Sequence, residues 1–404
     1  MTPVMSPART AVLGALLITT GPFSMALLTP ALPAAARDLG IPEAEAALML
    51  SVYLCGFALF QLVTGPIADA LGRRRTALVF IVIYGLGSLV ALFSSSIDLL
   101  LLGRLFQGIG VSCGLVVSRA MVRDQFSGRS AALVFSTTAL CNAVIPLVSP
   151  TLGALVVSLA SWRAIFFVMF GYAVVLLLVL LGAMRETLAA GEVIHFTPKP
   201  AFKRYGRLLR DQDFIWPALS IGCCIGGIYT LSAGLPFLLI ERAGLSELTF
   251  GLVMMLQTGS YIVGSSIARW LLQYMTAEGV ASLGTAFIGS GGVMFLILPH
   301  VLPPSTAAYM SGVAVWVLGN GLALPSLTSS ALENQKSMVG VASALLGFIQ
   351  IGIGFIGATV LGLVFSDAAV GTTILVPAAS LATVAFHLVA RRYRREVSSN
   401  PGRD

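Results

Sequence analysis

Long hydrophobic segments alternate with short polar ones along the whole chain. Twelve of these segments reach about 20 residues, the length that an α-helix needs to cross roughly 30 Å of hydrocarbon. They cover approximately residues 10–32, 45–69, 76–94, 98–122, 130–157, 162–184, 213–240, 246–270, 278–298, 304–330, 338–365 and 370–390. They lack the two-residue alternation of membrane β-strands, so helices are left as the way to satisfy the backbone in lipid. The pattern predicts an all-α membrane protein with twelve transmembrane helices.

The longest polar stretch separates the sixth hydrophobic segment from the seventh. It predicts an N-terminal six-helix bundle at residues 1–184, a basic cytoplasmic linker at 185–212, and a C-terminal six-helix bundle with a cytoplasmic tail at 213–404. Pro198 and Pro200 are expected to break a helix within the linker. A short amphipathic helix near residues 201–211, lying on the membrane surface, and a solvated tether both fit the rest of the linker.

The two halves of the chain resemble each other weakly. Gly56–Gly72 ends the second hydrophobic segment and Gly259–Gln273 ends the eighth, and both are glycine-spaced stretches that lead into a turn near an arginine. Two parallel six-helix repeats are an architecture of secondary transporters, whose substrate site lies between the repeats near the bilayer midplane. The sequence therefore predicts two pseudo-symmetric six-helix bundles and a small-molecule substrate.

Composition agrees with a chain that lies in lipid. Charged residues make up 10% of the sequence and hydrophobic residues 57%, with a mean hydropathy of +0.94, which excludes a water-soluble domain and makes the lipid bilayer the main partner. The net charge of +7 is unevenly placed. If the N-terminus is cytoplasmic, the cytoplasmic side holds Arg9, Arg73, Arg74, Arg75, Arg119, Arg123, Arg129, Lys199, Lys203, Arg204, Arg207, Arg210, Arg269, Lys336, Arg391, Arg392, Arg394 and Arg395, against Arg37, Arg163 and Arg242 outside. This asymmetry predicts that both termini are cytoplasmic, and it explains the charge by topology instead of nucleic-acid binding.

Groups of residues for catalysis or cofactor binding are not evident. The cysteines all lie within hydrophobic segments and show no paired zinc spacing: Cys55, Cys113, Cys141, Cys223 and Cys224. The sequence has no phosphate-binding GxxxxGK[ST] motif and no nucleophile–base pair. We therefore expect no cofactor, no metal site, no catalytic residues and no enzymatic activity.

Several segments carry a family pattern. In the first half these are GPIADALGRRR at Gly65–Arg75, RLFQGIG at Arg104–Gly110 and VSRAMVRDQF at Val117–Phe126. With them the chain resembles the major facilitator superfamily. In the second half, three segments are similar to the Bcr/CflA group, the bicyclomycin- and chloramphenicol-type drug-resistance exporters: GLPFLLIERAGLSELTFGL at Gly234–Leu252, GNGLALP at Gly319–Pro325 and GVASALLGFIQIGIG at Gly340–Gly354.

The resemblance implies a secondary transporter in the inner membrane of a bacterium, with the proton gradient as its energy source. Such antiporters alternate between inward- and outward-open states and expel small amphipathic drug-like compounds, which gives multidrug efflux and antibiotic resistance. Carried over to this sequence, Asp69, Arg73 and Asp124 would form a cytoplasmic charge cluster that latches the outward-open state. Independent solvated charges are the alternative for these three residues. We expect a monomer.

Arg104 falls inside a predicted helix. It lies about six residues into the fourth helix, which is roughly 9 Å from the outer end at 1.5 Å per residue. An arginine at this depth either faces a cavity, where it binds substrate or acts on a nearby carboxylate, or extends its head group to the outer interface. Gln107, one helical step further on, is expected to share the face of Arg104.

The first helix departs from the exporter pattern. ALLTPALP at Ala26–Pro33 places alanine where the exporters carry an aspartate, and the polar residues of this helix are Thr19, Thr20, Ser24 and Thr29. No other carboxylate lies at an obvious mid-membrane position. Arg104 without such a partner favours an alternative, the uptake of a small anionic or zwitterionic solute such as a siderophore or a peptide-like compound. A non-transporting sensor that kept the fold is a third possibility.

The fifth helix carries NAVIPLVSPTLGA at Asn142–Ala154, similar to a proline-rich variant of the exporters. Pro146 and Pro150 are expected to bend this helix and Gly153 to permit close packing, either to help close the outer cavity or as plain bundle packing. Further candidates for the cavity lining are Tyr53, Asn142, Tyr229, Tyr261, Trp316, Asn320 and Gln350. His195 and His300 fall in expected loops, and His387, near the cytoplasmic end of the twelfth helix, is assigned no role.

Overall fold

The computed structural model describes residues 3–188, 198–303, 305–333, 335 and 338–399, and these residues contain helices and no strand. Twelve spans within them are long and apolar enough to cross a membrane: Pro7–Leu39, Glu43–Leu71, Arg73–Leu92, Ile97–Gln125, Gly128–Leu159, Ala164–Ala183, Gln212–Arg242, Glu247–Leu271, Ala277–Val301, Thr306–Leu332, Gly340–Val364 and Ala368–Glu396. The predicted all-α membrane fold with twelve transmembrane helices is confirmed. The boundaries differ from the expected ones mainly at the ends of the first and twelfth spans.

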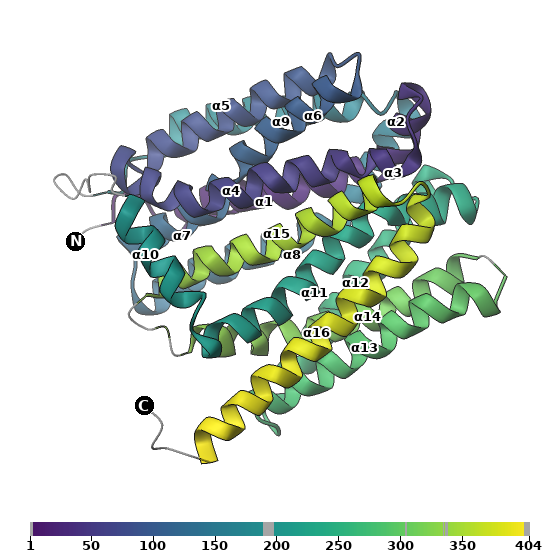
Figure 1. Ribbon diagram of the computed structural model, residues 1–404. Coiled ribbons are helices and arrows are strands. Elements are labelled where there is room, and N and C mark those ends of the chain that lie inside the picture. Colours follow the sequence, from purple (N-terminus) through teal and green to yellow (C-terminus); the bar gives the residue numbers. More distant parts are fainter. Residues whose placement is uncertain (1–2, 189–197, 304, 334, 336–337, 400–404) are drawn as a thin grey trace. The chain divides into compact units, whose positions relative to one another are not determined.

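Contacts divide the chain into two compact units, of which unit 1 comprises Met1–Ile41 and Leu48–Pro198. Its elements are α1 (Pro7–Leu28), the 3₁₀ turn η1 (Thr29–Ala31), α2 (Leu32–Leu39), α4 (Leu48–Leu71), α5 (Arg73–Leu92), α6 (Ile97–Val111), α7 (Cys113–Gln125), α8 (Gly128–Leu159) and α9 (Ala164–Ala183). Within this unit α5 packs against α6 and α9, α4 packs against α6, and α1 packs against α7 and α8 (Figure 1).

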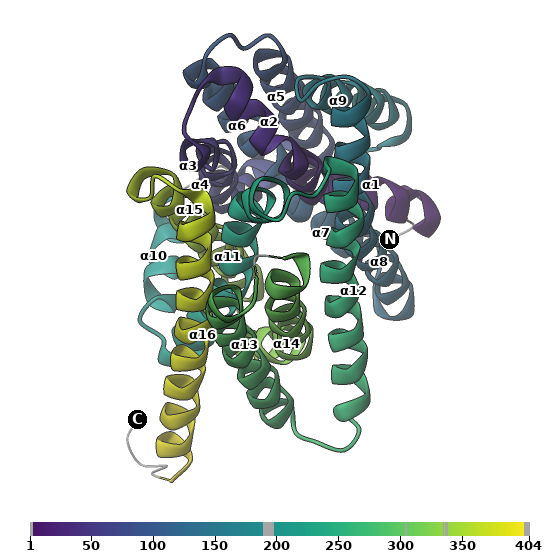
Figure 2. The same cartoon turned by 90° about the vertical axis from the view of Figure 1, so that its right-hand side faces the viewer.

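Unit 2 comprises Pro42–Ala47 and Lys199–Asp404. Its elements are α3 (Glu43–Ala46), most of α10 (Pro198–Leu208), α11 (Gln212–Pro236), the π-helical turn η2 (Phe237–Arg242), α12 (Glu247–Leu271), α13 (Ala277–Val301), α14 (Thr306–Leu332), α15 (Val339–Val364) and α16 (Ala368–Ser399). Here α13 and α12 pack against α14, and α11 packs against both α15 and α16 (Figure 2).

Each unit has one end that is rich in arginine, which we name its basic end. In unit 1 it is the end where α4 and α7 finish and α5 begins, and in unit 2 it is the end where α11 and α13 begin and α16 finishes. Five of the described helices begin on a side-chain cap, whose hydroxyl accepts a hydrogen bond from the backbone N–H three residues later: Ser6, Ser96, Ser246, Thr276 and Ser305. Such caps satisfy one of the open N–H groups of a helix and set where it starts.

Glycine lets some helices approach to backbone contact. A Cβ atom added at Gly108 of α6 would lie 2.0 Å from the carbonyl oxygen of Tyr53 in α4, and one added at Gly153 of α8 would lie 2.1 Å from that of Leu27 in α1. Both distances are far below van der Waals contact. Small residues at helix contacts are the usual way to gain dispersion energy between helices in lipid, where water does not drive association.

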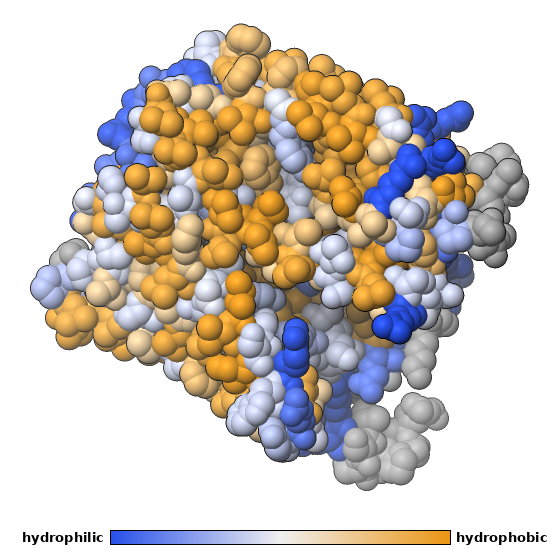
Figure 3. Space-filling view, turned by 180° about the vertical axis from the view of Figure 1, so that it is seen from behind, coloured by the Kyte–Doolittle hydropathy of each residue, from blue (hydrophilic) through white to orange (hydrophobic). Residues whose placement is uncertain are grey.

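The surface of the helices suits lipid. Large apolar side chains are exposed on several transmembrane helices, among them Leu140, Val175, Leu252 and Leu363. In Figure 3 hydrophobic residues cover most of the face that is seen, and hydrophilic residues gather mainly towards its margins. Exposed apolar area of this extent would be an aggregation hazard in water, and it is the surface that a transmembrane helix presents to acyl chains.

Three expectations about helix boundaries were wrong. Pro198 begins α10 and Pro200 lies in its first turn, so neither breaks a helix, because the N–H groups of the first turn need no partner within the helix. His300 lies in the last turn of α13, not in a loop, and the arginines expected in a C-terminal tail extend α16 to Ser399. His195 and Lys336 lie outside the described residues.

The close contact at Gly153 predicts a stability difference between two glycine substitutions. Gly153→Ala forces a methyl group onto the Leu27 carbonyl, and overpacking of this kind costs about 1–3 kcal/mol. Gly171→Ala in α9 is the matched control, because nothing lies within 4 Å of its added Cβ. The measurement is the thermal midpoint of each purified variant in the same detergent. We expect a lower midpoint for Gly153→Ala alone, and equal midpoints would contradict the packing described for α1 and α8.

Candidate functional site

Arg104 lies at the centre of a buried polar group in unit 1. Its side chain on α6 is 0% exposed. The guanidinium Nε donates a hydrogen bond to the Met49 carbonyl at 2.9 Å, and a terminal nitrogen donates to Gln107 Oε1 at 2.7 Å. The guanidinium carbon lies 4.2 Å from the centre of the Tyr53 ring, a cation–π contact. The reading in which Arg104 extends to the outer interface is therefore wrong, because its head group is fixed inside the unit.

Gln107 continues this group towards α5 and α9. Its amide nitrogen donates to Ser88 Oγ at 2.8 Å and lies 3.4 Å from Met169 Sδ, and the residue is fully buried. Arg104 and Gln107 thus share one face of α6, as the spacing predicted. The described residues include no carboxylate within salt-bridge distance of Arg104, and its second terminal nitrogen has no hydrogen-bond partner among them. A buried cation held only by neutral groups attracts an anion strongly, because little water screens it.

The residues of α1 and η1 carry hydroxyl side chains and no acidic side chain. Ser24 Oγ lies 2.6 Å from the Tyr84 hydroxyl of α5, and Thr20 Oγ1 lies 3.4 Å from the Tyr172 hydroxyl of α9. Thr19 and Thr29 donate to backbone carbonyls four residues earlier in the first span. All four of these hydroxyls of α1 and η1 are buried, and they contact other helices or their own backbone.

The structure brings Asp69, Arg73 and Asp124 together at the basic end of unit 1. Arg73 donates to Asp69 Oδ1 at 2.5 Å and to Asp124 Oδ2 at 2.9 Å, which connects α4, α5 and α7. The Arg73 side chain is 4% exposed, that of Asp124 15% and that of Asp69 41%. The three residues are therefore not independent solvated charges. Because Arg73 is nearly buried, its two acidic neighbours are needed to compensate its charge.

Glu186 belongs to the same group, although no sequence motif identified it as a site residue. It follows α9, and its carboxylate accepts hydrogen bonds from the backbone nitrogens of Arg73 at 2.8 Å and Arg74 at 3.1 Å. An acidic residue at this place satisfies open N–H groups and interacts well with the dipole of α5. Gly72 has φ +91°, and a Cβ there would lie 2.5 Å from Glu186. The contact spans more than a hundred residues, and no spacing in the sequence indicates it.

In unit 2 the structure brings together Trp316 and Asn320 on α14. Both are buried, and the Asn320 amide donates to the Trp316 carbonyl at 3.0 Å. Asn320 Oδ1 and Trp316 Nε1 have no partner among the described residues. Tyr229 of α11 packs against Gly354 of α15. Buried polar groups need hydrogen-bond partners. A transport substrate or a water molecule would find these two groups open here.

The remaining candidates are more dispersed. Asn142 of α8 and Gln350 of α15 are half-buried, as is Tyr261 of α12, and Asn142 Oδ1 has no partner among the described residues. Pro146 and Pro150 lie inside α8, which continues as one helix past both prolines to Leu159. Gly153 permits the contact with α1 described above. The described residues hold no group of three or more metal-binding side chains.

The comparison with known sequences identifies the class of protein. Residues 14–358 match the Major Facilitator Superfamily, and the chain belongs to this superfamily of membrane transporters. It is therefore a multi-pass membrane transporter and not an enzyme.

Relatives of the chain extend over nearly its whole length. It is 31% identical to the uncharacterized MFS-type transporter YdgK of Bacillus subtilis over 375 residues. These residues cover 91% of each chain. It is 28% identical over 339 residues to the multidrug resistance protein MdtL of Escherichia coli, covering 81% of this chain and 84% of that protein.

Solved structures share the fold. One is a POT family transporter in complex with 5-aminolevulinic acid, with a TM-score of 0.76, 14% identity and 96% coverage of each chain. Another is the xylose transporter XylE from Escherichia coli, with a TM-score of 0.72, 10% identity, and coverage of 95% of this chain and 97% of that one. At these identities the likeness concerns the fold alone.

The burial of the charge cluster predicts an unequal effect of its two aspartates. Asp124→Asn leaves nearly buried Arg73 with one half-exposed partner and should destabilise the protein by about 2–3 kcal/mol. Asp69→Asn removes the more exposed partner and should cost less than about 1 kcal/mol. Thermal midpoints of the two variants measure the difference. A larger loss for Asp69→Asn would show that Asp124 is not the main partner of Arg73.

Proposed function

We propose that this transporter is a proton-coupled exporter of small amphipathic drug-like compounds, of the kind found in the Bcr/CflA group. The observation that carries the proposal is the similarity to the multidrug resistance protein MdtL over most of both chains. The protein would act as a monomer in a bacterial inner membrane, with the proton gradient as its energy source. The basic ends of both units and both termini would face the cytoplasm, because basic residues concentrate on that side of a membrane.

The charge cluster supports a cycle between two states. It joins the ends of three helices of unit 1 with Arg73 as the shared donor, and Glu186 attaches the segment after α9 to the start of α5. Such a connection biases a two-state equilibrium by its free-energy difference between the states. We propose that it holds unit 1 in the outward-open state and loosens as the transporter turns inward.

A second function is favoured by Arg104. This residue is fully buried, the described residues offer it no carboxylate, and Ala26 replaces the acidic residue of the exporters. A buried cation of this kind would attract a small anionic or zwitterionic solute, which the protein would then take up. Under the export hypothesis the same residue would receive the polar end of an amphipathic compound.

Growth and vesicle experiments separate the two functions. If the protein exports drugs, a deletion strain becomes more sensitive to compounds such as ethidium or chloramphenicol. Its growth on an anionic nutrient is unchanged. In energised everted vesicles, addition of a transported compound should make the interior more alkaline, because protons leave as the compound enters. Failure of the deletion strain to use an anionic nutrient, with unchanged drug sensitivity, would support uptake instead.

The geometry around Arg104 predicts that lysine cannot replace it. Lysine cannot reach the Met49 carbonyl, Gln107 and the Tyr53 ring together, since its ammonium is a single point charge without the planar fork of arginine. We expect Arg104→Lys to lower the initial rate of transport at least about tenfold, which corresponds to 1.4 kcal/mol.

Arg242→Lys is the matched control for this variant. Arg242 pairs with Asp367 near the other end of unit 2, and its side chain is half-exposed. The Arg242→Lys variant should transport at nearly the wild-type rate. If the Arg104→Lys variant transports at the wild-type rate, Arg104 is not part of the substrate site under either function.

A further inference from the structure

Proton exchange needs a titratable group that water can reach, and the described carboxylates of unit 2 lie near helix ends. Asp213 and Glu278 are in the first turns of α11 and α13, whereas Glu241 and Asp367 lie at the opposite ends of the helices. Ala26 leaves α1 of unit 1 without an acidic residue. A group other than a mid-membrane carboxylate is therefore of interest for the proposed antiport.

His387 on α16 is such a group. Its side chain is buried, with 6% exposure, and lies within the twelfth membrane span. Its Nε2 lies 3.0 Å from Ser282 Oγ of α13. His300 differs in every respect that matters here, because it is exposed and lies at the far end of α13 from the basic end.

The hydrogen bonds of Ser282 indicate which nitrogen of His387 is basic. The Ser282 hydroxyl donates to the Glu278 carbonyl at 2.8 Å, so its one hydrogen is used. In this arrangement the Ser282 oxygen accepts from His387, and Nε2 carries the hydrogen. In the neutral ring this leaves Nδ1 with the free lone pair, and Nδ1 makes no hydrogen bond to any described residue. A proton would therefore bind at Nδ1.

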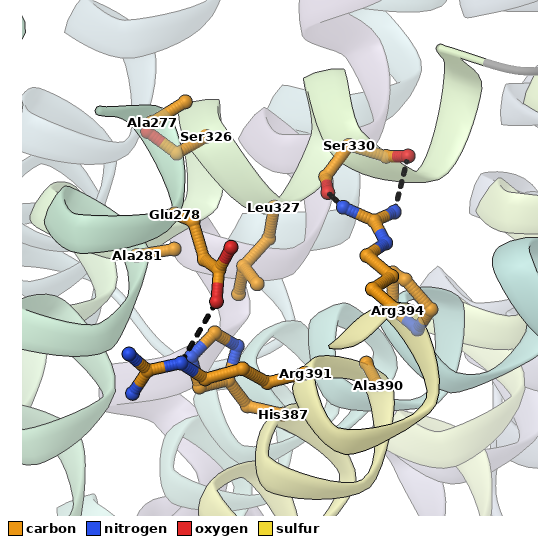
Figure 4. A pocket seen from close by; sticks show the side chains of 11 residues that line it. Ala277, Glu278, Ala281, Ser326, Leu327, Ser330, His387, Ala390, Arg391 and Arg394 are labelled. Carbon is orange, nitrogen blue, oxygen red and sulfur yellow. Dashed lines mark hydrogen bonds and ion pairs between the residues drawn. The ribbon is translucent and has the colours of Figure 1, made fainter. Parts of the chain in front are cut away.

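A small cavity lies beside this histidine at the basic end of unit 2 (Figure 4). Its volume is about 30 Å³, and it lies between α11, α13, α14 and α16. Ser326 lines it, is 4% exposed, and has a hydroxyl without a partner among the described residues. A cavity of this size has room for one or two water molecules. Water there would find Ser326 as a partner, and Glu278, which also lines the cavity, has an exposed side chain at the basic end of unit 2.

The charged groups that line the cavity come from α13 and α16. Glu278 of α13 forms an ion pair with Arg391 of α16 at 2.8 Å. Arg394, one turn further along α16, bonds to Ser330 of α14 and lies 4.0 Å from Asp213 of α11. The α14 residues that line the cavity are uncharged, and the sequence of α15, which also packs against α16, contains no charged residue.

We propose that His387 is a proton-binding site at which unit 2 exchanges protons with the cytoplasm, an inference that rests on the proposed antiport function. Neutral imidazole takes a proton from hydronium in the cavity at Nδ1, which forms imidazolium and leaves water, and the reverse step releases the proton. The imidazolium stands beside Arg391 and Arg394 and competes with Arg391 for Glu278. Protonation thereby weakens the ion pair that joins α13 to α16, which connects the proton to the packing of these helix ends.

Purified protein in liposomes tests this site with ethidium as the transported compound. Two rates are measured for each variant, transport driven by a pH gradient and counterflow of labelled against unlabelled ethidium, which moves no net proton. For His387→Gln, which keeps an N–H donor for Ser282 but binds no proton, the ratio of driven transport to counterflow should fall at least tenfold, and the dependence of the driven rate on internal pH should disappear. His300→Gln should match the wild type. A driven rate and pH profile of His387→Gln equal to those of the wild type would overturn the inference.

A second measurement does not depend on any substrate. The chain has three histidines, so the resonances of histidine labelled with carbon-13 at Cε1 can be assigned with the His387→Gln and His300→Gln variants. Spectra are recorded between about pH 5 and 8, and the His387 resonance should shift as the ring gains a proton. A resonance that stays constant across this range would overturn the proton site even if drug transport is observed. If His387 titrates but the wild-type protein transports no ethidium, the export function is contradicted instead.

Discussion

Hydrocarbon offers no hydrogen-bond partner to a peptide group or a charged side chain, and this constraint determines most of the arrangement. Backbone groups are satisfied within the twelve helical spans, and hydroxyl side chains such as Thr19 and Thr29 donate to their own helix. Because lipid is as apolar as the helices, association rests on close packing. Gly108 and Gly153 therefore bring backbones of neighbouring helices together where any larger residue would separate them.

The same constraint explains how the charges are held. At the basic end of unit 1, nearly buried Arg73 is compensated by Asp69 and Asp124, and Glu186 completes the start of α5. At the basic end of unit 2, Arg391 and Arg394 pair with carboxylates that begin other helices. In both units an ionic connection joins helix ends that are distant in sequence. Breaking such a connection costs more at Arg73, which is nearly buried, than at Arg391, whose side chain and whose partner Glu278 are exposed to water.

Arg104 and His387 are the two groups that depart from this rule in ways that bear on transport. Arg104 is held by carbonyl, amide and aromatic groups, so its positive charge is not neutralised by any described residue. His387 avoids the difficulty differently, since imidazole can remain neutral until water delivers a proton. Under the proposed function the first would meet the polar part of a substrate and the second would serve the coupling ion, in separate units of the chain.

The sequence by itself determined the membrane class, the number of spans and nearly all of their boundaries, because hydrophobic length is a local property that lipid enforces segment by segment. It also placed Arg104 beside Gln107 and identified Asp69, Arg73 and Asp124 as a candidate group, since their spacing and family pattern are visible in the chain. The role of Glu186, the burial of Arg104 and the pairing of His387 with Ser282 were decided only by the tertiary structure. Each of these depends on which helix faces lie together, and hydrophobic residues on every side of a membrane helix leave that choice to packing.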